Sequence, residues 1–315
     1  MKAILFSAFL IPTWAAASCG SAFCTVNTSW DVQGAWTEPG TRLDFRYEYI
    51  NQDQPMTGSR KIGVGEVPRH HDEVYTYNRN YVTTVDRTFG PDWGVSVLIP
   101  VVDREHYHIH NHMGAQLDER WDFTALGDVR MLARRRLASF QDAEPSAAVA
   151  ALNFGLKLPT GKTDIKNADG DAAERSLQPG SGTTDLLIGA SYSKLRPTKN
   201  LSTFAQGLMQ LPLNEHDDYK PGNRVSLDAG LRYSVGEQLG LLLQANALWR
   251  GRDRGAEAEP EDTGGTSVFL SPGLSYAIGK SFNVYGFFQV PVYQYVNGVQ
   301  LTARKAFTIG ATLRM

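Results

Sequence analysis

The sequence predicts an all-β fold: a transmembrane antiparallel β-barrel of about 12 strands. Apolar and polar residues alternate in one segment after another from residue 41 to the C-terminus, as happens when the two faces of a strand meet different surroundings. Most of these segments run for about 11 to 15 residues, which is enough for a tilted strand to cross a bilayer. Short and long connections also follow one another in turn, which is typical of bacterial outer-membrane barrels. A soluble β-sandwich is the alternative, but it rarely sustains so many long strands.

The first 17 residues have the pattern of a secretory signal peptide. Lys2 is followed by an apolar run, and Ala15, Ala16 and Ala17 provide the small residues of a cleavage site. We therefore expect the mature chain to begin near Ser18, with lipidation of Cys19 as the alternative. No later stretch approaches the roughly 20 apolar residues of a spanning helix. Export then leaves two classes of protein, a soluble exported protein or an outer-membrane barrel.

Residues 18–40 are expected to form a periplasmic N-terminal segment. It contains the two cysteines of the chain, Cys19 and Cys24, and in an oxidising compartment this pair most simply closes a small disulfide loop. A metal or redox pair is the alternative, although two thiols alone make an incomplete metal site. The segment either plugs the barrel or forms a periplasmic strap.

Residues 41–315 are expected to form the barrel itself. In its first strand Leu43 and Phe45 alternate with Arg42 and Asp44, and the same alternation continues to the end of the chain. The 30 glycines, 13 tyrosines and 14 phenylalanines favour β structure with many turns. The expected strands are 41–51, 73–87, 93–106, 121–137, 147–159, 185–195, 201–213, 224–235, 239–250, 266–278, 282–296 and 300–314.

The connections between these strands predict the orientation of the barrel in its membrane. The short connections are RTFGPDW, SFQDAEPS, RPTKN, GEQ and GKS, and the long ones are 52–72, 107–120, 160–184, 214–223 and 251–265. In bacterial outer-membrane barrels the short turns are periplasmic. We therefore expect both termini in the periplasm, the long loops outside the cell, and outer-membrane lipid around the barrel.

The stretch REHYHIHNH carries four of the seven histidines at every second position: His106, His108, His110 and His112. In a strand this spacing puts all four on one face, so we expect a ladder that rises from the pore mouth into the following loop and faces water. Further candidate ligands nearby are His70, His71, Asp103, Glu105, Asp118 and Glu119. Imidazole suits transition metals, which makes the ladder a candidate copper or zinc site. The alternative is a solvated histidine-rich loop without a metal.

Charged residues fall on the face of the strands that is expected to line the lumen. The candidates for pore-lining charge are Arg104, Asp128, Arg130, Arg134, Arg136, Lys157 and Arg232. Such side chains are tolerated in a lumen and not against lipid. They predict either a constriction that favours anions or polar solutes, or salt-bridge networks that fill a narrow barrel.

A resemblance to a known family rests on residues 156–193. LKLPTGKTD, an acidic loop and SLQPGSGTTDLLIGASYS resemble the transporter-like outer-membrane family that is named after the meta-pathway of phenol degradation. Prolines near strand ends in VLIPVV, MQLPLN and FQVPVY extend this resemblance over nearly the whole mature chain. It implies an outer-membrane channel whose substrate is unassigned. One departure is the chain end Leu313-Arg314-Met315, where such barrels usually carry an aromatic residue.

The sequence thus predicts a porin-like channel for small solutes, with a transition-metal site at its extracellular mouth. The alternative is a non-conducting metal-binding or structural surface protein whose lumen is plugged. The chain has no His-x-Ser pair, phosphate loop, nucleotide fingerprint or haem-attachment motif, so we expect no enzymatic activity. Nothing in it indicates a nucleic-acid partner, and it leaves the oligomeric state open.

Overall fold

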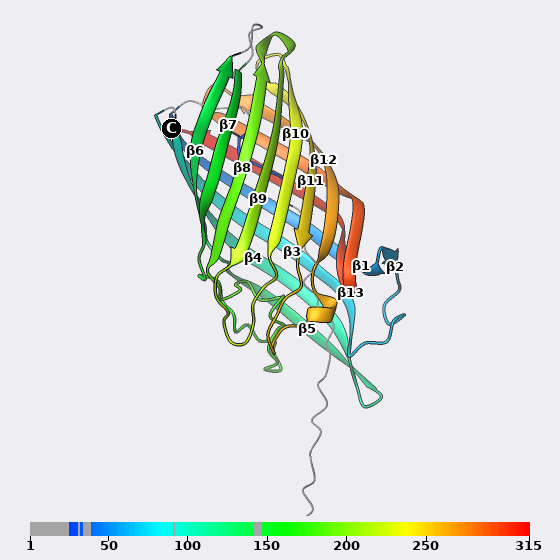
Figure 1. The fold of residues 1–315 in the computed structure, drawn as a ribbon. Helices are drawn as coiled ribbons and strands as arrows, with labels where there is room; N and C mark the ends of the chain where they lie inside the picture. The colour runs from blue at the N-terminus through cyan, green and yellow to red at the C-terminus, as the bar shows by residue number, and fades with distance from the viewer. Residues whose placement is uncertain (1–24, 31, 34–38, 91, 142–146) are drawn as a thin grey trace, which may run out of the picture.

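The computed structural model describes residues 25–30, 32–33, 39–90, 92–141 and 147–315, and shows a closed antiparallel β-barrel (Figure 1). Of the thirteen strands in this part of the chain, eleven form the barrel wall, whereas β2 and β5 pair outside that ring. The elements are β1 (Gly40–Gly58), β2 (Arg60–Lys61), β3 (His71–Phe89), β4 (Trp93–His112), β5 (Ala115–Leu126), β6 (Arg130–Gln141), β7 (Ala147–Lys157), β8 (Asp185–Arg196), η1 (Pro197–Lys199), β9 (Leu201–Pro212), β10 (Arg224–Val235), β11 (Leu239–Arg250), η2 (Pro260–Asp262), β12 (Gly265–Ile278) and β13 (Phe282–Arg314).

The barrel closes through β13, which is 33 residues long and crosses the wall twice. It pairs with β12 from Phe282 to Val296 and with β1 from Val296 to Arg314. The chain reverses next to Gly298, whose φ of 56° lies in the left-handed region that glycine adopts without strain. Because every neighbouring pair is antiparallel, a closed ring needs an even number of crossings. Eleven wall strands with β13 counted twice give 12 crossings, in line with the expected architecture.

Alternating side chains give each strand a lipid-facing and a lumen-facing set. On β4, Trp93, Val95 and Ile99 are 43%, 37% and 36% exposed. Large apolar side chains are exposed in the same rhythm on other strands, among them Leu43, Phe45, Val85, Leu152, Phe154, Ile188, Tyr192, Leu227, Leu231, Leu241, Leu243, Leu270, Leu274, Ile309 and Leu313. An apolar outer surface on a closed barrel matches lipid hydrocarbon, so the protein lies in the bacterial outer membrane. In the described part of the chain, no helix has the length and apolar character to cross a membrane.

The two ends of the barrel differ in the length of their connections. The end called here the loop end carries the connections 158–184, 213–223 and 251–264 together with the β4–β5 hairpin. The opposite end, the turn end, carries the short connections after β8, β10 and β12, and the chain terminus labelled C lies there (Figure 1). This separation of long and short connections is the one that the sequence predicts.

Two sequence expectations about β4 and its neighbours are wrong. The segment 121–137 is not one strand, because β5 ends at Leu126 and β6 begins at Arg130. The segment 107–120 is not a loop, because β4 continues to His112 and turns through Met113 and Gly114 into β5. Cross-strand pairing of β5 with residues 101–112 of β4 extends this hairpin beyond the ring of wall strands, whereas β6 pairs with residues 93–98.

The N-terminal segment lies inside the barrel where the structure describes it. Val26 and Trp30 are buried, and the Trp30 indole Nε1 donates a hydrogen bond to Thr312 Oγ1 at 2.9 Å. The Trp30 ring packs edge-on against Tyr285 at 5.0 Å, and Asn27 N donates to Gln244 Oε1 at 3.0 Å. These described residues therefore lie inside the barrel, as the plug alternative predicts for them.

The remainder of the expected periplasmic segment includes Cys19 and Cys24. Both cysteines, like the whole expected signal peptide, lie outside the described residues. The disulfide between them stays a prediction.

Candidate functional site

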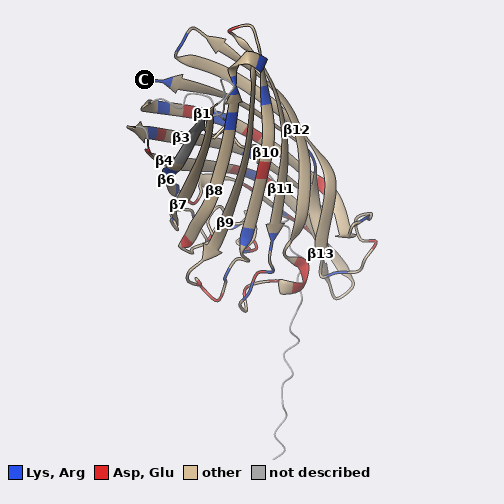
Figure 2. Cartoon of the chain, turned by 45° about the horizontal axis from the view of Figure 1, so that its top comes forward, with Lys and Arg blue, Asp and Glu red and all other residues tan. Residues whose placement is uncertain are grey.

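The lumen contains a cavity of about 500 Å³. Residues 25–30 of the N-terminal segment, the barrel strands and residues 175–181 all contribute to its wall. Basic and acidic positions occur along the strands of the barrel as well as in its loops (Figure 2). Among the described residues the cavity is lined by nine basic and six acidic side chains, namely Arg42, Arg46, Arg104, Arg130, Arg134, Lys157, Arg175, Arg224 and Arg250 with Asp44, Glu48, Asp86, Asp128, Asp185 and Asp228.

The predicted pore-lining charges fall into two groups. Arg104, Asp128, Arg130, Arg134 and Lys157 line the cavity. Arg136 and Arg232 do not line it, although each shares a strand face with a residue that does: Arg134 on β6 and Asp228 on β10. Alternation predicts on which face of a strand a side chain lies. It does not predict where along the barrel the cavity lies, because that depends on the segments that fill the lumen.

Buried ion pairs hold much of this charge in place. Arg42 pairs with Asp86, and Arg46 Nε lies 2.7 Å from Glu48 Oε1. The side chains of Arg46 and Glu48 are both nearly buried. A buried charge needs a partner of this kind, because its desolvation is costly otherwise. The prediction of salt bridges inside the barrel is therefore confirmed for these residues of β1 and β3.

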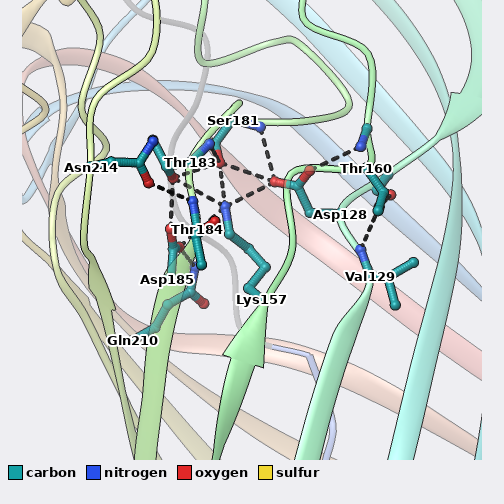
Figure 3. A network of polar contacts seen from close by, with 12 residues as sticks. Asp128, Val129, Lys157, Thr160, Ser181, Thr183, Thr184, Asp185, Gln210 and Asn214 are labelled. Atoms are coloured by element: carbon teal, nitrogen blue, oxygen red, sulfur yellow. Dashed lines mark hydrogen bonds and ion pairs between the residues drawn. The ribbon is translucent and has the colours of Figure 1, made fainter.

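Lys157, at the end of β7, is the centre of a second network (Figure 3). Its Nζ lies 2.9 Å from Asp128 Oδ2 and 3.2 Å from Asp185 Oδ2, and it donates to Ser181 and Thr183. Asp128 Oδ1 accepts a hydrogen bond from the backbone N–H of Gly161 at 3.0 Å.

These contacts fasten both ends of the connection 158–184. Asp128 Oδ2 accepts the backbone N–H of Ser181 at 3.0 Å, close to where β8 begins. The motifs LKLPTGKTD and SLQPGSGTTD therefore supply residues that anchor this connection to the barrel wall.

Arg130 differs from the other cavity cations. It lies between Leu98 of β4 and Lys157 of β7 in the strand register. Within the described part of the chain it makes no hydrogen bond or ion pair, whereas Lys157, Arg42 and Arg46 are paired. Its guanidinium lines the cavity without a direct ion pair to a described residue.

The six histidines singled out in the sequence gather at the loop end. His70 and His71 stand at the beginning of β3, beside the ladder on β4. Nε2 of His70 lies 3.1 Å from Nε2 of His110, and Nδ1 of His70 lies 3.2 Å from Nε2 of His71. The rings of His71 and His108 stack with centroids 4.3 Å apart. The structure thus confirms that these two parts of the chain meet.

The ladder differs from the expectation in its exposure to water. His106 is 0% and His108 is 1% exposed, because Trp121 and the connection 158–184 pack over them. Nε2 of His106 lies 3.2 Å from Nδ1 of His108. His110 and His112, farther along β4, are only partly buried. The expectation that all four face water is wrong for the first two.

Three carboxylates complete the cluster. Glu119 accepts hydrogen bonds from His108 Nε2 at 2.9 Å and from His110 Nδ1 at 2.8 Å. Glu73 Oε2 lies 3.7 Å from His106 Nε2, and Glu174 Oε1 lies 3.4 Å from His71 Nδ1.

Sequence reasoning named only one of these carboxylates, Glu119. Glu73 pairs with His108 in the strand register, so recognising the register between β3 and β4 could have found it. Glu174 lies in the connection 158–184, and no periodicity places a loop residue.

These side chains offer three overlapping sets of ligand atoms, each set within 4.8 Å: His70–His71–His110, His71–His108–Glu174 and Glu73–His106–His108. His112 belongs to none of them, although its ring lies 5.8 Å from that of His110. Nitrogens bound tetrahedrally to zinc are about 3.3 Å apart, which is close to the observed spacing. Burial, and then repulsion from His71 and His110, lowers the pKa of His70 to about 4, so this imidazole is neutral at neutral pH, as a metal ligand must be. The residues present fit a transition-metal ion.

Comparison with solved structures places this barrel among outer-membrane proteins. The COG4313 outer membrane channel from Pseudomonas putida F1 is 12% identical, with a TM-score of 0.67, and the match covers 92% of this chain and 100% of that chain. The NanC porin is 11% identical with a TM-score of 0.46, covering 87% of this chain and 100% of the other. A FadL homologue from Pseudomonas aeruginosa is 12% identical with a TM-score of 0.40, covering 98% and 99%. At such identities the first likeness shows the fold. No curated protein matches the chain.

The family comparison agrees with the resemblance seen in the sequence. The family model described as "Putative MetA-pathway of phenol degradation" matches residues 71–304. This range runs from the first residue of β3 into β13 and so takes in most of the barrel wall. Because the match spans well over half of the chain, the protein belongs to the family of the MetA-pathway of phenol degradation.

Proposed function

We propose that the protein is an outer-membrane channel for small polar or anionic solutes, oriented with its loop end outside the cell and its termini in the periplasm. The observation that carries this proposal is the charged cavity inside the barrel, where basic side chains exceed acidic ones by three among the described residues. A volume of about 500 Å³ suits a small molecule. Fixed charge of one sign in a low-dielectric passage favours solutes of the opposite sign. The outer-membrane channel of Pseudomonas putida, which shares this fold, supports a channel role.

Pairing of the acidic side chains strengthens the preference for anions. Asp128 and Asp185 both contact Lys157, and Asp86 contacts both Arg42 and Arg134. These three negative charges are therefore matched by three cations within the wall, whereas Arg130 is not compensated by a direct contact with any described residue. A solute that carries a carboxylate can dock on this guanidinium with two hydrogen bonds.

Conductance of the purified protein in planar bilayers tests the channel directly. A salt gradient across the bilayer should give a reversal potential with the sign of anion preference. Because residues 25–30 and Val32 line the cavity inside the barrel, the same measurement is made with residues 25–33 deleted. A barrel that conducts in neither form is not a channel, and cation preference in both forms contradicts the role given to Arg130.

One observation favours the alternative of a non-conducting surface protein. The N-terminal segment is held in the lumen by hydrogen bonds of Asn27 and Trp30 to barrel residues, so the path is narrowed in this state. If the deletion leaves the barrel non-conducting, this alternative is the better account.

We also propose that the histidine cluster binds a copper or zinc ion, with Glu73, Glu119 and Glu174 as the nearest carboxylates. Ring nitrogens of His70 and His110, from two separate parts of the chain, lie 3.1 Å apart, which supports a shared ion. Imidazole is a good ligand for both metals. Within this proposal the protein acts by binding and transport and not as an enzyme.

Titration of the metal-free protein with zinc or copper against a chromogenic chelator tests this site. The test variant replaces His106, His108, His110 and His112 together with Gln. The seventh histidine, His216, belongs to none of the three ligand sets and provides the matched control, His216→Gln. Affinity should collapse in the first variant and stay unchanged in the second. Equal affinity in both would remove the site.

A further inference from the structure

The connection 158–184 covers part of the lumen, and one stretch of it lines the cavity. Residues 175–181 form this stretch. Leu177 is 1% exposed and packs in a small core with Trp121 and Ala173. Arg104, on the facing wall, donates a hydrogen bond to the backbone carbonyl of Leu177. The position of this stretch therefore decides how open the loop end of the cavity is.

Glu174 stands immediately before that stretch and fixes its conformation. Its backbone carbonyl accepts the N–H groups of Leu177 at 2.9 Å and Gln178 at 3.2 Å, which closes a tight turn. A contact that fixes the position of Glu174 therefore also fixes the turn, and the turn places Leu177 at the lumen.

The side chain of Glu174 points at two histidines that belong to the barrel strands. Glu174, His71 and His108 form one of the three ligand sets, and Glu174 Oε1 lies 3.4 Å from His71 Nδ1. That nitrogen is buried and makes no hydrogen bond with any described residue. A buried polar atom without a hydrogen bond lowers the stability of the fold, and a metal ion bound to this nitrogen would supply the missing partner. This set is the one in which a residue of the connection 158–184 joins residues of β3 and β4.

The charge of the cavity argues against the metal ion as the transported solute. Among the described lining residues the excess of three positive charges disfavours passage of a divalent cation. A metal ion bound at the loop end would therefore have its effect at that site and would not pass through the channel.

We propose that a transition-metal ion bound by His71, His108 and Glu174 fastens the connection 158–184 over the cavity, so that metal occupancy regulates access to the lumen. This inference rests on the proposed metal binding by the histidine cluster. Each ligand comes from a different element: the start of β3, the extended part of β4, and the connection itself. The ion thus joins the connection to two strands that are already hydrogen-bonded to each other.

Hydrogen exchange with mass spectrometry on the full-length protein, with zinc chloride or with EDTA, tests the proposal. Zinc should slow exchange of the amides in residues 173–178. At a zinc concentration 100 times the dissociation constant, linkage limits this slowing to about 100-fold. Glu174→Gln should lose the slowing yet still bind zinc, because the other two ligand sets lack this residue. Asp169→Asn, an exposed carboxylate change in the same connection, should behave like the unaltered protein.

The outcomes separate this inference from the proposal on which it rests. If the unaltered protein binds no zinc, the metal site itself is refuted. If it binds zinc but exchange in residues 173–178 is the same with zinc and EDTA, the site stands and the fastening is refuted. If zinc slows amide exchange equally in the unaltered protein and in Glu174→Gln, the fastening is also refuted. Bilayer recordings provide a second readout, in which zinc should reduce conductance of the protein and leave that of Glu174→Gln unchanged.

Discussion

Nε2 of His70 lies 3.1 Å from Nε2 of His110, although the two residues are 40 positions apart in the sequence. The contact exists because β3 and β4 are hydrogen-bonded neighbours and their register places His71 opposite His110. Two imidazole nitrogens at this separation suit one metal ion. The pair belongs to the most exposed of the three ligand sets and is where an ion from the medium would bind first.

Replacing His70 and His110 with Gln should weaken zinc binding by at least about 10-fold, since loss of an outer-shell partner alone costs 10- to 100-fold in metal affinity. Isothermal titration of the metal-free protein measures this change. The set Glu73–His106–His108 is left intact, so residual binding is expected. Undiminished affinity would mean that the exposed set takes no part.

Arg130→Gln should reduce the anion preference of the channel. The substitution removes a positive charge that no described residue neutralises by direct contact, while leaving the ion pairs of the wall in place. The reversal potential in a salt gradient should move toward zero. Arg60→Gln changes an exposed residue at the loop end and is the matched control. A shift of equal size in the control would assign the selectivity to surface charge.

Lys157→Met should destabilise the barrel by about 3 to 5 kcal/mol, because Asp128 and Asp185 would be left without their cation in a nearly water-free environment. Unfolding in guanidinium chloride, followed by tryptophan fluorescence, measures the loss. Lys166→Met changes an exposed lysine of the connection 158–184 and should leave the free energy of unfolding within about 0.5 kcal/mol. Equal stability of both variants would show that the network is dispensable.

Trp30→Ala should raise the conductance of the barrel. The change removes the hydrogen bond to Thr312 and the edge-on contact with Tyr285, which are the main anchors of the plug at this residue. Burial of a tryptophan contributes several kcal/mol, so the segment should leave the lumen more often. Single-channel recordings report the open fraction. Thr28→Ala alters a neighbouring residue of the same segment and serves as control; an unchanged open fraction in Trp30→Ala would contradict the plug.

Much of the barrel follows from the alternation of the sequence. Positions such as Trp93, Val95 and Ile99 face lipid as the pattern predicts, because adjacent side chains of a strand point to opposite faces. The wall charges Arg130 and Lys157 face the cavity for the same reason. The hairpin at Met113 and Gly114 escaped prediction because alternation alone does not distinguish a strand that extends beyond the wall from a polar loop.

The sequence by itself determined the barrel class, the lipid-facing and lumen-facing sets, the family, and the common face of the histidines, since each depends on local spacing or on a contiguous motif. Only the tertiary structure decided that His106 and His108 are buried, that Glu73 and Glu174 stand beside them, and that residues 25–30 enter the lumen. These are contacts between segments far apart in the chain. They depend on strand register and on how connections fold back, and no local pattern in the sequence specifies either.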